Sequence, residues 1–219
     1  MKIAKHTTLC QPAVTALLCL LLVFAQPAGG AGTPGDGVEQ APDGQTPDEA
    51  ALTYYREGLA HKETALALEA AAAATTDEDE RARLLDEARA AYQAAVQVQG
   101  RALKLDLDYV EAANELGFAL RSTGDYRKAL GAYNFALEIR PDFYPAIEYR
   151  GEAYLALGML TEAKDAYLML FRNDLALAAR LLDAMAAADT NDAEFRAWVL
   201  ERQRLAAVTP GAADAASSW

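Results

Sequence analysis

The sequence has few of the side chains that enzymes use as nucleophiles or as soft metal ligands. Its 219 residues include two cysteines, two histidines and three serines. Both cysteines, Cys10 and Cys19, lie near the start of the chain, and Ser217 and Ser218 lie at its other end. A Ser-His-Asp or Cys-His arrangement is therefore disfavoured. We predict a protein without enzymatic activity, cofactor or metal.

Positive charge is also scarce. The chain has 20 lysines and arginines against 32 aspartates and glutamates, which gives a formal net charge of -12. Because no basic stripe is present to neutralise phosphates, nucleic-acid binding is excluded. The acidic run at 77–80 lacks the glycine and the spacing of a calcium loop, so we interpret it as a solvated helix start favoured by the helix dipole. We interpret His61 as an ordinary packed or surface residue.

The first 31 residues have the layout of a secretory signal peptide. Lys2 and Lys5 form a positive head, an uncharged apolar run follows at 13–25, and small or helix-breaking residues occupy 27–31. The apolar run is too short for a membrane span, which needs roughly 20 residues. We therefore predict an exported, periplasmic protein; an uncleaved N-terminal signal anchor that tethers the chain to the membrane is the alternative. Cleavage would remove both cysteines, so no disulfide is expected in the mature chain.

Abundant alanine and rare proline predict an all-α fold. Alanine, the best helix former, supplies 50 residues. Residues 32–47 carry four glycines and three prolines with almost nothing apolar, and we predict that they form a disordered linker. Thr46 then begins a capping box, because its hydroxyl can accept from the amide of Glu49 while the Glu49 carboxylate reaches back. No proline follows Pro47 before Pro141, so the stretch between them can be helical apart from its turns.

From residue 113 onward the sequence repeats itself with a period of 34 residues. The recurring positions pair Gly117 with Gly151, Gly124 with Gly158, Ala129 with Ala163 and Tyr133 with Tyr167. Other positions of the pattern are Leu120, Ala136 and Pro141 in the first of these copies and Tyr154 in the second. This pattern resembles the tetratricopeptide repeat, in which each unit is a pair of antiparallel helices.

The spacing has a physical basis in helix packing. Gly117 and Ala129 are small, which allows two antiparallel helices to approach closely, and Tyr133 fills the space beside them. A single hairpin cannot bury its own apolar face, so about three units must stack. We predict a repeat domain at 48–173 that forms a short right-handed α-solenoid of stacked helix-turn-helix units.

An expanded first unit precedes these two copies. Gly58 matches the first-helix glycine, but it lies 59 residues before Gly117 instead of 34. The extra residues fall around 70–83, and both flanking segments remain strongly helical. We therefore predict that both helices of the first unit are longer by about three turns and form a projecting hairpin, with Thr75 and Glu78 providing a new cap at its turn.

Two further helices are predicted at 174–207, where the period is lost but apolar residues keep helical spacing. A stack of hairpins exposes an apolar end, and we expect these helices to cap it with charged side chains outward. Those charged residues are Arg196, Glu201, Arg202 and Arg204. The tail at 208–219 is rich in small residues and is predicted to be disordered; the role of Trp219 at its end stays open.

The resemblance implies that a partner binds in a concave groove lined by the first helix of each unit. The residues at the positions that face this groove are Tyr55, Leu59, Asn114, Phe118, Arg121, Glu148 and Glu152. The family's clamp of Lys, Asn and Arg for a terminal carboxylate is disfavoured, because only Asn114 is compatible with it and the two glutamates would repel an anion. An aromatic end and an anionic end would suit an apolar or basic partner segment. The alternative is that these residues form only a solvated face.

The predicted function is that of an exported, non-enzymatic scaffold or adaptor that binds another envelope protein. The alternative is a structural subunit that self-associates, or docks in a larger envelope assembly, through the long first hairpin. The fold does not identify the partner, because one repeat architecture serves unrelated ligands.

Overall fold

A computed structural model of the chain describes residues 41, 42 and 44–208. The predicted signal peptide with Cys10 and Cys19, most of the predicted linker, and Trp219 lie outside these residues. Within the described part every regular element is an α-helix, which confirms the predicted fold class. The eight helices of this part are α1 (Pro47–Ala74), α2 (Glu78–Leu105), α3 (Val110–Ser122), α4 (Tyr126–Ile139), α5 (Tyr144–Ala156), α6 (Leu160–Asn173), α7 (Leu175–Ala187) and α8 (Ala193–Val208). None of the helices in the described ranges is long and apolar enough to cross a membrane.

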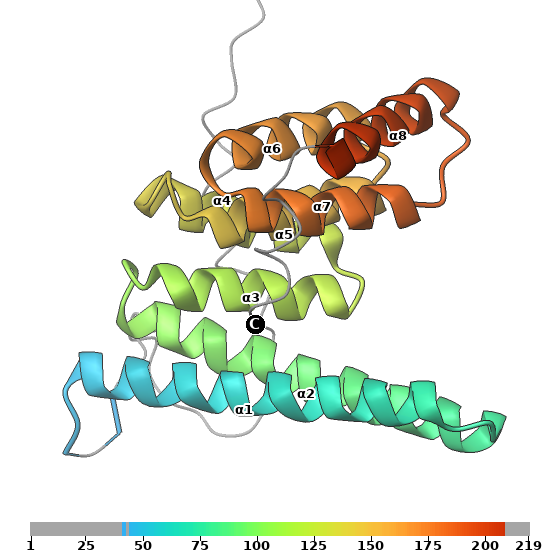
Figure 1. Ribbon diagram of the computed structural model, residues 1–219. Helices are drawn as coiled ribbons and strands as arrows, with labels where there is room; N and C mark the ends of the chain where they lie inside the picture. Colours follow the sequence, from blue (N-terminus) through green and yellow to red (C-terminus); the bar gives the residue numbers. More distant parts are fainter. Residues whose placement is uncertain (1–40, 43, 209–219) are drawn as a thin grey trace, which may run out of the picture. The chain divides into compact units, whose positions relative to one another are not determined.

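The helices pack in consecutive pairs that stack on one another (Figure 1). α1 packs on α2, α3 on α4, α5 on α6 and α7 on α8. The first helices of the pairs also contact one another in the order α1, α3, α5, α7. They form one layer, and we call its surface away from the second helices the first-helix face. The arrangement confirms the predicted stack of helical hairpins.

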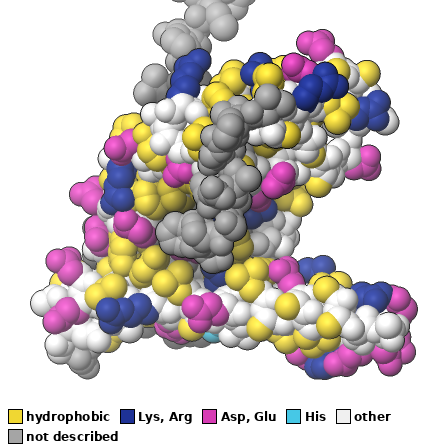
Figure 2. Space-filling view, in the orientation of Figure 1, with side chains coloured by type: hydrophobic (Ala, Val, Ile, Leu, Met, Phe, Trp, Pro, Cys, Tyr) yellow, Lys and Arg dark blue, Asp and Glu magenta, His cyan; other side chains and the backbone are white. Residues whose placement is uncertain are grey.

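The first hairpin is much longer than the others, as predicted. α1 and α2 have 28 residues each, whereas α3 has 13 and α4 has 14. At a rise of 1.5 Å per residue, the long helices extend about 42 Å, roughly twice the length of α3. Figure 2 shows acidic and basic side chains gathered at the far end of this hairpin. Among them, Arg83 bridges Glu80 and Glu87 along α2.

The predicted capping box at the start of α1 is confirmed. The Thr46 hydroxyl accepts a hydrogen bond from the Glu49 amide at 3.3 Å, and the Glu49 carboxylate accepts one from the Thr46 amide at 2.9 Å. Pro47 takes the first helical position, where its missing N–H leaves no bond unmade. The Glu49 carboxylate accepts from both the amide and the hydroxyl of Thr46, and these two hydrogen bonds favour its charged form and lower its pKa.

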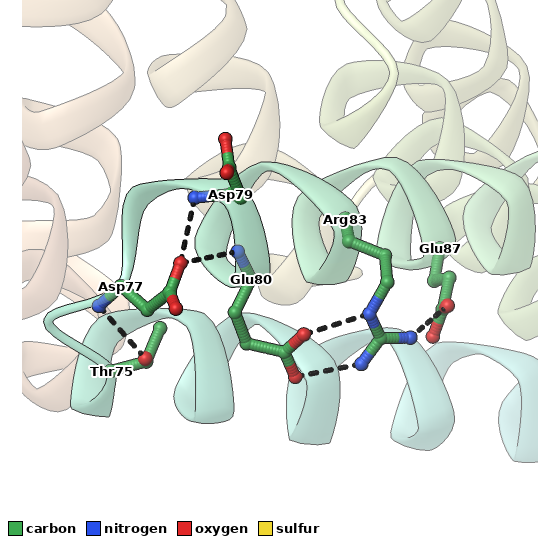
Figure 3. Close-up of polar contacts among 6 residues, drawn as sticks. All are labelled: Thr75, Asp77, Asp79, Glu80, Arg83 and Glu87. Atoms are coloured by element: carbon green, nitrogen blue, oxygen red, sulfur yellow. Dashed lines mark hydrogen bonds and ion pairs between the residues drawn. The ribbon is translucent and has the colours of Figure 1, made fainter.

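The cap at the start of α2 differs from the prediction. Asp77, and not the pair Thr75 and Glu78, caps this helix (Figure 3). Its carboxylate accepts from the amides of Asp79 and Glu80 at 3.0 and 3.1 Å, and Thr75 instead ends α1. A carboxylate satisfies two helix amides and also meets the positive end of the helix dipole, which favours it over a hydroxyl.

Close contact between helices explains two of the repeated glycines. A β-carbon at Gly117 would lie 2.4 Å from the Tyr133 ring, and one at Gly58 would lie 2.2 Å from the Gln99 side chain. Gln99 stands 34 residues before Tyr133 in the sequence, so the two hairpins use the same packing position with different side chains. The expanded first unit is therefore built on the same register as the second.

The third glycine packs differently from its counterparts. The atoms nearest to a β-carbon at Gly151 belong to Leu181 of α7, at 2.6 Å, and not to Tyr167. Tyr167 instead meets the Trp198 ring of α8 edge-on, with 5.4 Å between the ring centroids. The last two helices thus enter the core of the third hairpin.

The remaining repeat positions lie where the pattern places them. Gly124 and Gly158 occupy turns with φ of 87° and 71°, a left-handed conformation that glycine adopts without strain. The buried positions of the pattern are Leu120, Ala129, Ala136 and Ala163. Pro141 follows the end of α4, and Tyr154 is half-buried in α5.

α8 covers the C-terminal end of the stack, as predicted. Phe195 and Val199 are buried in the cluster formed with α6 and α7. Of the four charged residues expected to face outward, three are exposed, and Arg202 is half-buried with its guanidinium 5.1 Å from the Trp198 ring centroid. The positive charge over the ring adds to the contact, since an aromatic face is electron-rich.

Candidate functional site

The seven residues predicted to line a groove lie on three neighbouring first helices. α1 carries Tyr55 and Leu59, α3 carries Asn114, Phe118 and Arg121, and α5 carries Glu148 and Glu152. Because α1 contacts α3 and α3 contacts α5, all seven belong to adjacent elements. The structure brings four of them, Phe118, Arg121, Glu148 and Glu152, into one set of contacts.

The other three lie apart from this set. Tyr55 packs on Tyr109, with 4.9 Å between the ring centroids. Leu59 is half-buried on α1. Asn114 is buried, and its Nδ2 donates to Glu115 Oε1 at 3.4 Å, while its Oδ1 has no hydrogen-bond partner within the described ranges.

Cationic and aromatic side chains alternate across the four first helices. Lys62 Nζ of α1 lies 4.0 Å from the Phe118 ring centroid of α3, and Arg121 lies 5.3 Å from the same centroid. Arg121 and Arg180 of α7 lie 5.5 and 5.8 Å from the Tyr149 ring centroid of α5. Each cation thus lies near the ring of an adjacent helix, which helps to hold the four helices together.

The same cations form ion pairs with glutamates of this face. The pairs are Lys62 with Glu115 at 2.8 Å, Arg121 with Glu152 at 2.5 Å, and Arg180 with Glu148 at 3.4 Å. We call these six residues, together with Phe118 and Tyr149, the first-helix cluster. It links α1, α3, α5 and α7 through charge as well as through aromatic contact.

Glu148 is the most unusual member of the first-helix cluster. Its side chain is 1% exposed, and neither carboxylate oxygen has a hydrogen-bond partner among the described residues. Burial, together with the negative charge of Glu152, raises the pKa of Glu148 to about 7 in spite of Arg180 nearby. At neutral pH this carboxyl is therefore charged in only part of the molecules.

Arg121 is also largely buried, but it has a close counter-ion in Glu152. Its side chain is 21% exposed, and burial alone would lower the pKa of its guanidinium. The negative charge of Glu152, together with smaller contributions from Tyr133 and Glu148, outweighs this effect and holds that pKa above its usual value. Arg121 and Glu152 thus form a stable charged pair at the centre of the first-helix cluster.

These contacts change the electrostatic character expected for the groove. Both glutamates of its predicted anionic end, Glu148 and Glu152, already have arginine partners, and Glu148 is buried. The most exposed charged side chain of the first-helix cluster is Arg180, at 56%. The charge that this end offers to solvent is therefore mainly positive.

Four members of the first-helix cluster were not anticipated from the sequence: Lys62, Glu115, Tyr149 and Arg180. For Lys62 a signal was present, because it stands four residues after Gly58 just as Arg121 stands four residues after Gly117. Arg180 had no such signal, since it lies beyond the 34-residue period. Only the packing of α7 on α5 brings it to Glu148.

An open hollow of about 530 Å³ adjoins Glu152. It lies between the end of α5, the start of α6 and the end of α7, and most of its lining is apolar. Leu155, Leu160 and Ala184 form its apolar walls, and Thr190 lies at its margin.

The described residues include no group of three His, Cys, Asp or Glu side chains that could hold a metal ion. His61 lies on α1, with its Nε2 3.8 Å from Glu57 Oε1 one turn earlier, and is partly exposed. It has the environment of an ordinary surface histidine.

No protein-family model and no curated protein matches this chain.

Proposed function

We propose that the chain is an exported, non-enzymatic adaptor of the tetratricopeptide-repeat type, which binds a segment of another envelope protein along its first-helix face. The observation that carries this proposal is the first-helix cluster, in which the first helices of the four hairpins contribute aromatic and charged side chains to one surface. Support also comes from the packing that the first two hairpins share, in which Gly58 lies against Gln99 and Gly117 lies against Tyr133, the residue 34 positions after Gln99. Export to the periplasm, or tethering by an uncleaved anchor, is proposed from the first 31 residues alone.

The surface has the composition of a peptide-binding site. Tyr55, Leu59 and Tyr149 are partly exposed and offer apolar contact. The Phe118 ring contacts the cationic groups of Lys62 and Arg121. Aromatic and arginine side chains are the residues most often responsible for binding energy at interfaces. An apolar partner segment suits this surface, whereas a basic one is less favoured because Glu148 and Glu152 already have arginine partners.

A photocrosslinking experiment tests the proposal. A photoreactive amino acid replaces Leu59 on the first-helix face or, as the matched control, Leu85 on α2, which is 43% exposed. We expect one envelope protein to crosslink to position 59 and not to position 85, and the adduct to disappear when Tyr55→Ala and Tyr149→Ala are added. Equal labelling from both positions, or labelling that survives both substitutions, would contradict binding at this face.

The length of the first hairpin favours a second candidate function. α1 and α2 continue well beyond the helices that stack on them, which would suit a structural subunit that self-associates or docks in a larger assembly. Sedimentation of the chain over a hundredfold concentration range tests this alternative. A mass that rises with concentration, and does not rise when the hairpin is shortened, would favour it.

A further inference from the structure

Glu148 and Arg180 form an ion pair whose two partners differ in their access to water. The Glu148 side chain is 1% exposed, whereas the Arg180 side chain is 56% exposed. Their closest atoms, Oε1 and Nη2, are 3.4 Å apart, longer than the roughly 2.8 Å of a good arginine–carboxylate hydrogen bond. Arg180 therefore holds a poorly placed internal partner while part of its side chain remains in contact with solvent.

Several packed elements act on Glu148. The charged and titratable groups around it are Arg121 of α3, Tyr133 of α4 beside Arg121, Tyr149 and Glu152 of α5, and Arg180 of α7. Arg121 is engaged by Glu152 at 2.5 Å, and the charge of Glu152 repels a charge on Glu148. An ionised Glu148 is thus compensated mainly by Arg180, across 3.4 Å and without a hydrogen bond.

We propose that Arg180 is a binding site for a side-chain carboxylate of an acidic partner segment, and that the internal carboxylate of Glu148 competes with the partner's carboxylate for Arg180. When Glu148 takes up a proton from solvent it becomes neutral, and Arg180 then pairs with the partner. The Tyr149 ring, 5.8 Å from the guanidinium, lies where it can contact the apolar stem of the partner residue. The inference rests on the proposed function for the existence of a partner, and adds the charge of that partner.

Proton uptake and binding are linked in a defined direction. Burial raises the pKa of Glu148 to about 7, so most molecules are neutral at this position at pH 6 and most are charged at pH 8. The carboxylate of a partner, with a pKa near 4, stays ionised throughout this range. If only molecules with neutral Glu148 bind the partner's carboxylate, the apparent affinity of the chain for this carboxylate increases about tenfold from pH 8 to pH 6.

A nuclear magnetic resonance titration of the full chain tests the site without knowledge of the partner. The probe is N-acetyl-glutamic acid methylamide, which carries one side-chain carboxylate, and the matched control is the glutamine analogue at the same ionic strength. The side-chain Nε resonance of Arg180, assigned from Arg180→Lys, reports binding. We expect the acid and not the amide to move this resonance, with about tenfold higher affinity at pH 6 than at pH 8.

Two substitutions separate the roles of the glutamates. In Glu148→Gln the affinity should become independent of pH and should equal that of the native chain at pH 6. Glu115→Gln, the same change at the glutamate paired with Lys62, should leave the pH dependence in place. The proposal is overturned if the acid moves the Arg180 resonance no more than the amide does, or if the native chain binds equally at both pH values. The native titration uses a variant only to assign the Arg180 resonance. Such a failure would leave crosslinking at position 59 unaffected, so the two proposals fail separately.

Discussion

Gly117 and Tyr133 approach so closely that the backbone of α3 rests on the aromatic ring of α4. A β-carbon at Gly117 would lie 2.4 Å from the ring, well inside van der Waals contact. The ring is itself buried and surrounded by the main core cluster, so it has little room to move away. The absence of a side chain at residue 117 is thus a requirement of the second hairpin.

We predict that Gly117→Ala lowers the free energy of unfolding by about 1–3 kcal/mol, the usual cost of overpacking a core. Gly100→Ala is the matched control, because Gly100 lies within α2 and a β-carbon there would meet nothing within 4 Å. Alanine at that position should stabilise the protein by up to about 1 kcal/mol through its helix propensity. Urea denaturation followed by circular dichroism measures both values, and equal effects would contradict the packing argument.

The Asp77 cap should stabilise the first turn of α2, at the far end of the first hairpin. Asp77→Ala leaves two amides of α2 without an acceptor, and we expect a loss of about 1 kcal/mol. Asp79→Ala removes a carboxylate from the same turn, but not the one that accepts these two hydrogen bonds, and should cost less. Amide hydrogen exchange at residues 79–83 measures the local opening. Faster exchange in the Asp79 variant than in the Asp77 variant would show that the cap is assigned to the wrong residue.

The last helix should be needed for the stability of the C-terminal part. Phe195 is 1% exposed, and Phe195→Ala should cost about 3–5 kcal/mol through lost burial and the cavity that remains. Leu200→Ala on the same helix removes a side chain that is 62% exposed, and should change stability by no more than about 0.5 kcal/mol. Thermal unfolding of the two variants gives the comparison. A similar loss in both would mean that α8 does not pack as described.

The buried carboxyl of Glu148 gives stability an identifiable pH dependence. Its pKa is higher in the folded chain, at about 7, than in the unfolded chain, so between about pH 4.5 and pH 7 the folded state binds more protons. Its contribution is therefore largest at low pH and is lost as the pH rises through 7. Relative to Glu148→Gln, which stays neutral, the native chain should lose at least about 1 kcal/mol between pH 5 and pH 8. Parallel curves for the two proteins across this range would contradict the assignment.

Much of the fold could be predicted because it depends on contacts between neighbouring units. The glycines and tyrosines at 34-residue spacing indicated the hairpins, and the capping box at Thr46 indicated the start of α1. The Gly151 contact could not be predicted, because Leu181 belongs to a helix outside the period and reaches α5 only through tertiary packing. The N-cap of α2 was misplaced by two residues, since several polar side chains in one turn compete for the same amides.

The candidate site was predictable in position but not in charge. Repeat register placed Phe118, Arg121, Glu148 and Glu152 on one face, and the structure brings them together. The counter-ions of the glutamates come from other helices, and no local pattern reveals that Glu148 is buried and paired with Arg180. Charge at an interface depends on such pairings, so a list of side chains on a face does not determine its polarity.

The length of α1 allows a force at its far end to act on the contacts near its middle. One uninterrupted helix runs from Pro47 to Ala74, and its last turns extend past α3 along α2 (Figure 1). Lys62 lies near the middle of this helix, where it meets Phe118 and Glu115 of the next hairpin. A force applied at the far end of the hairpin therefore acts as a torque about this contact. A partner that holds or pulls that end would therefore act on the packing of α1 against α3.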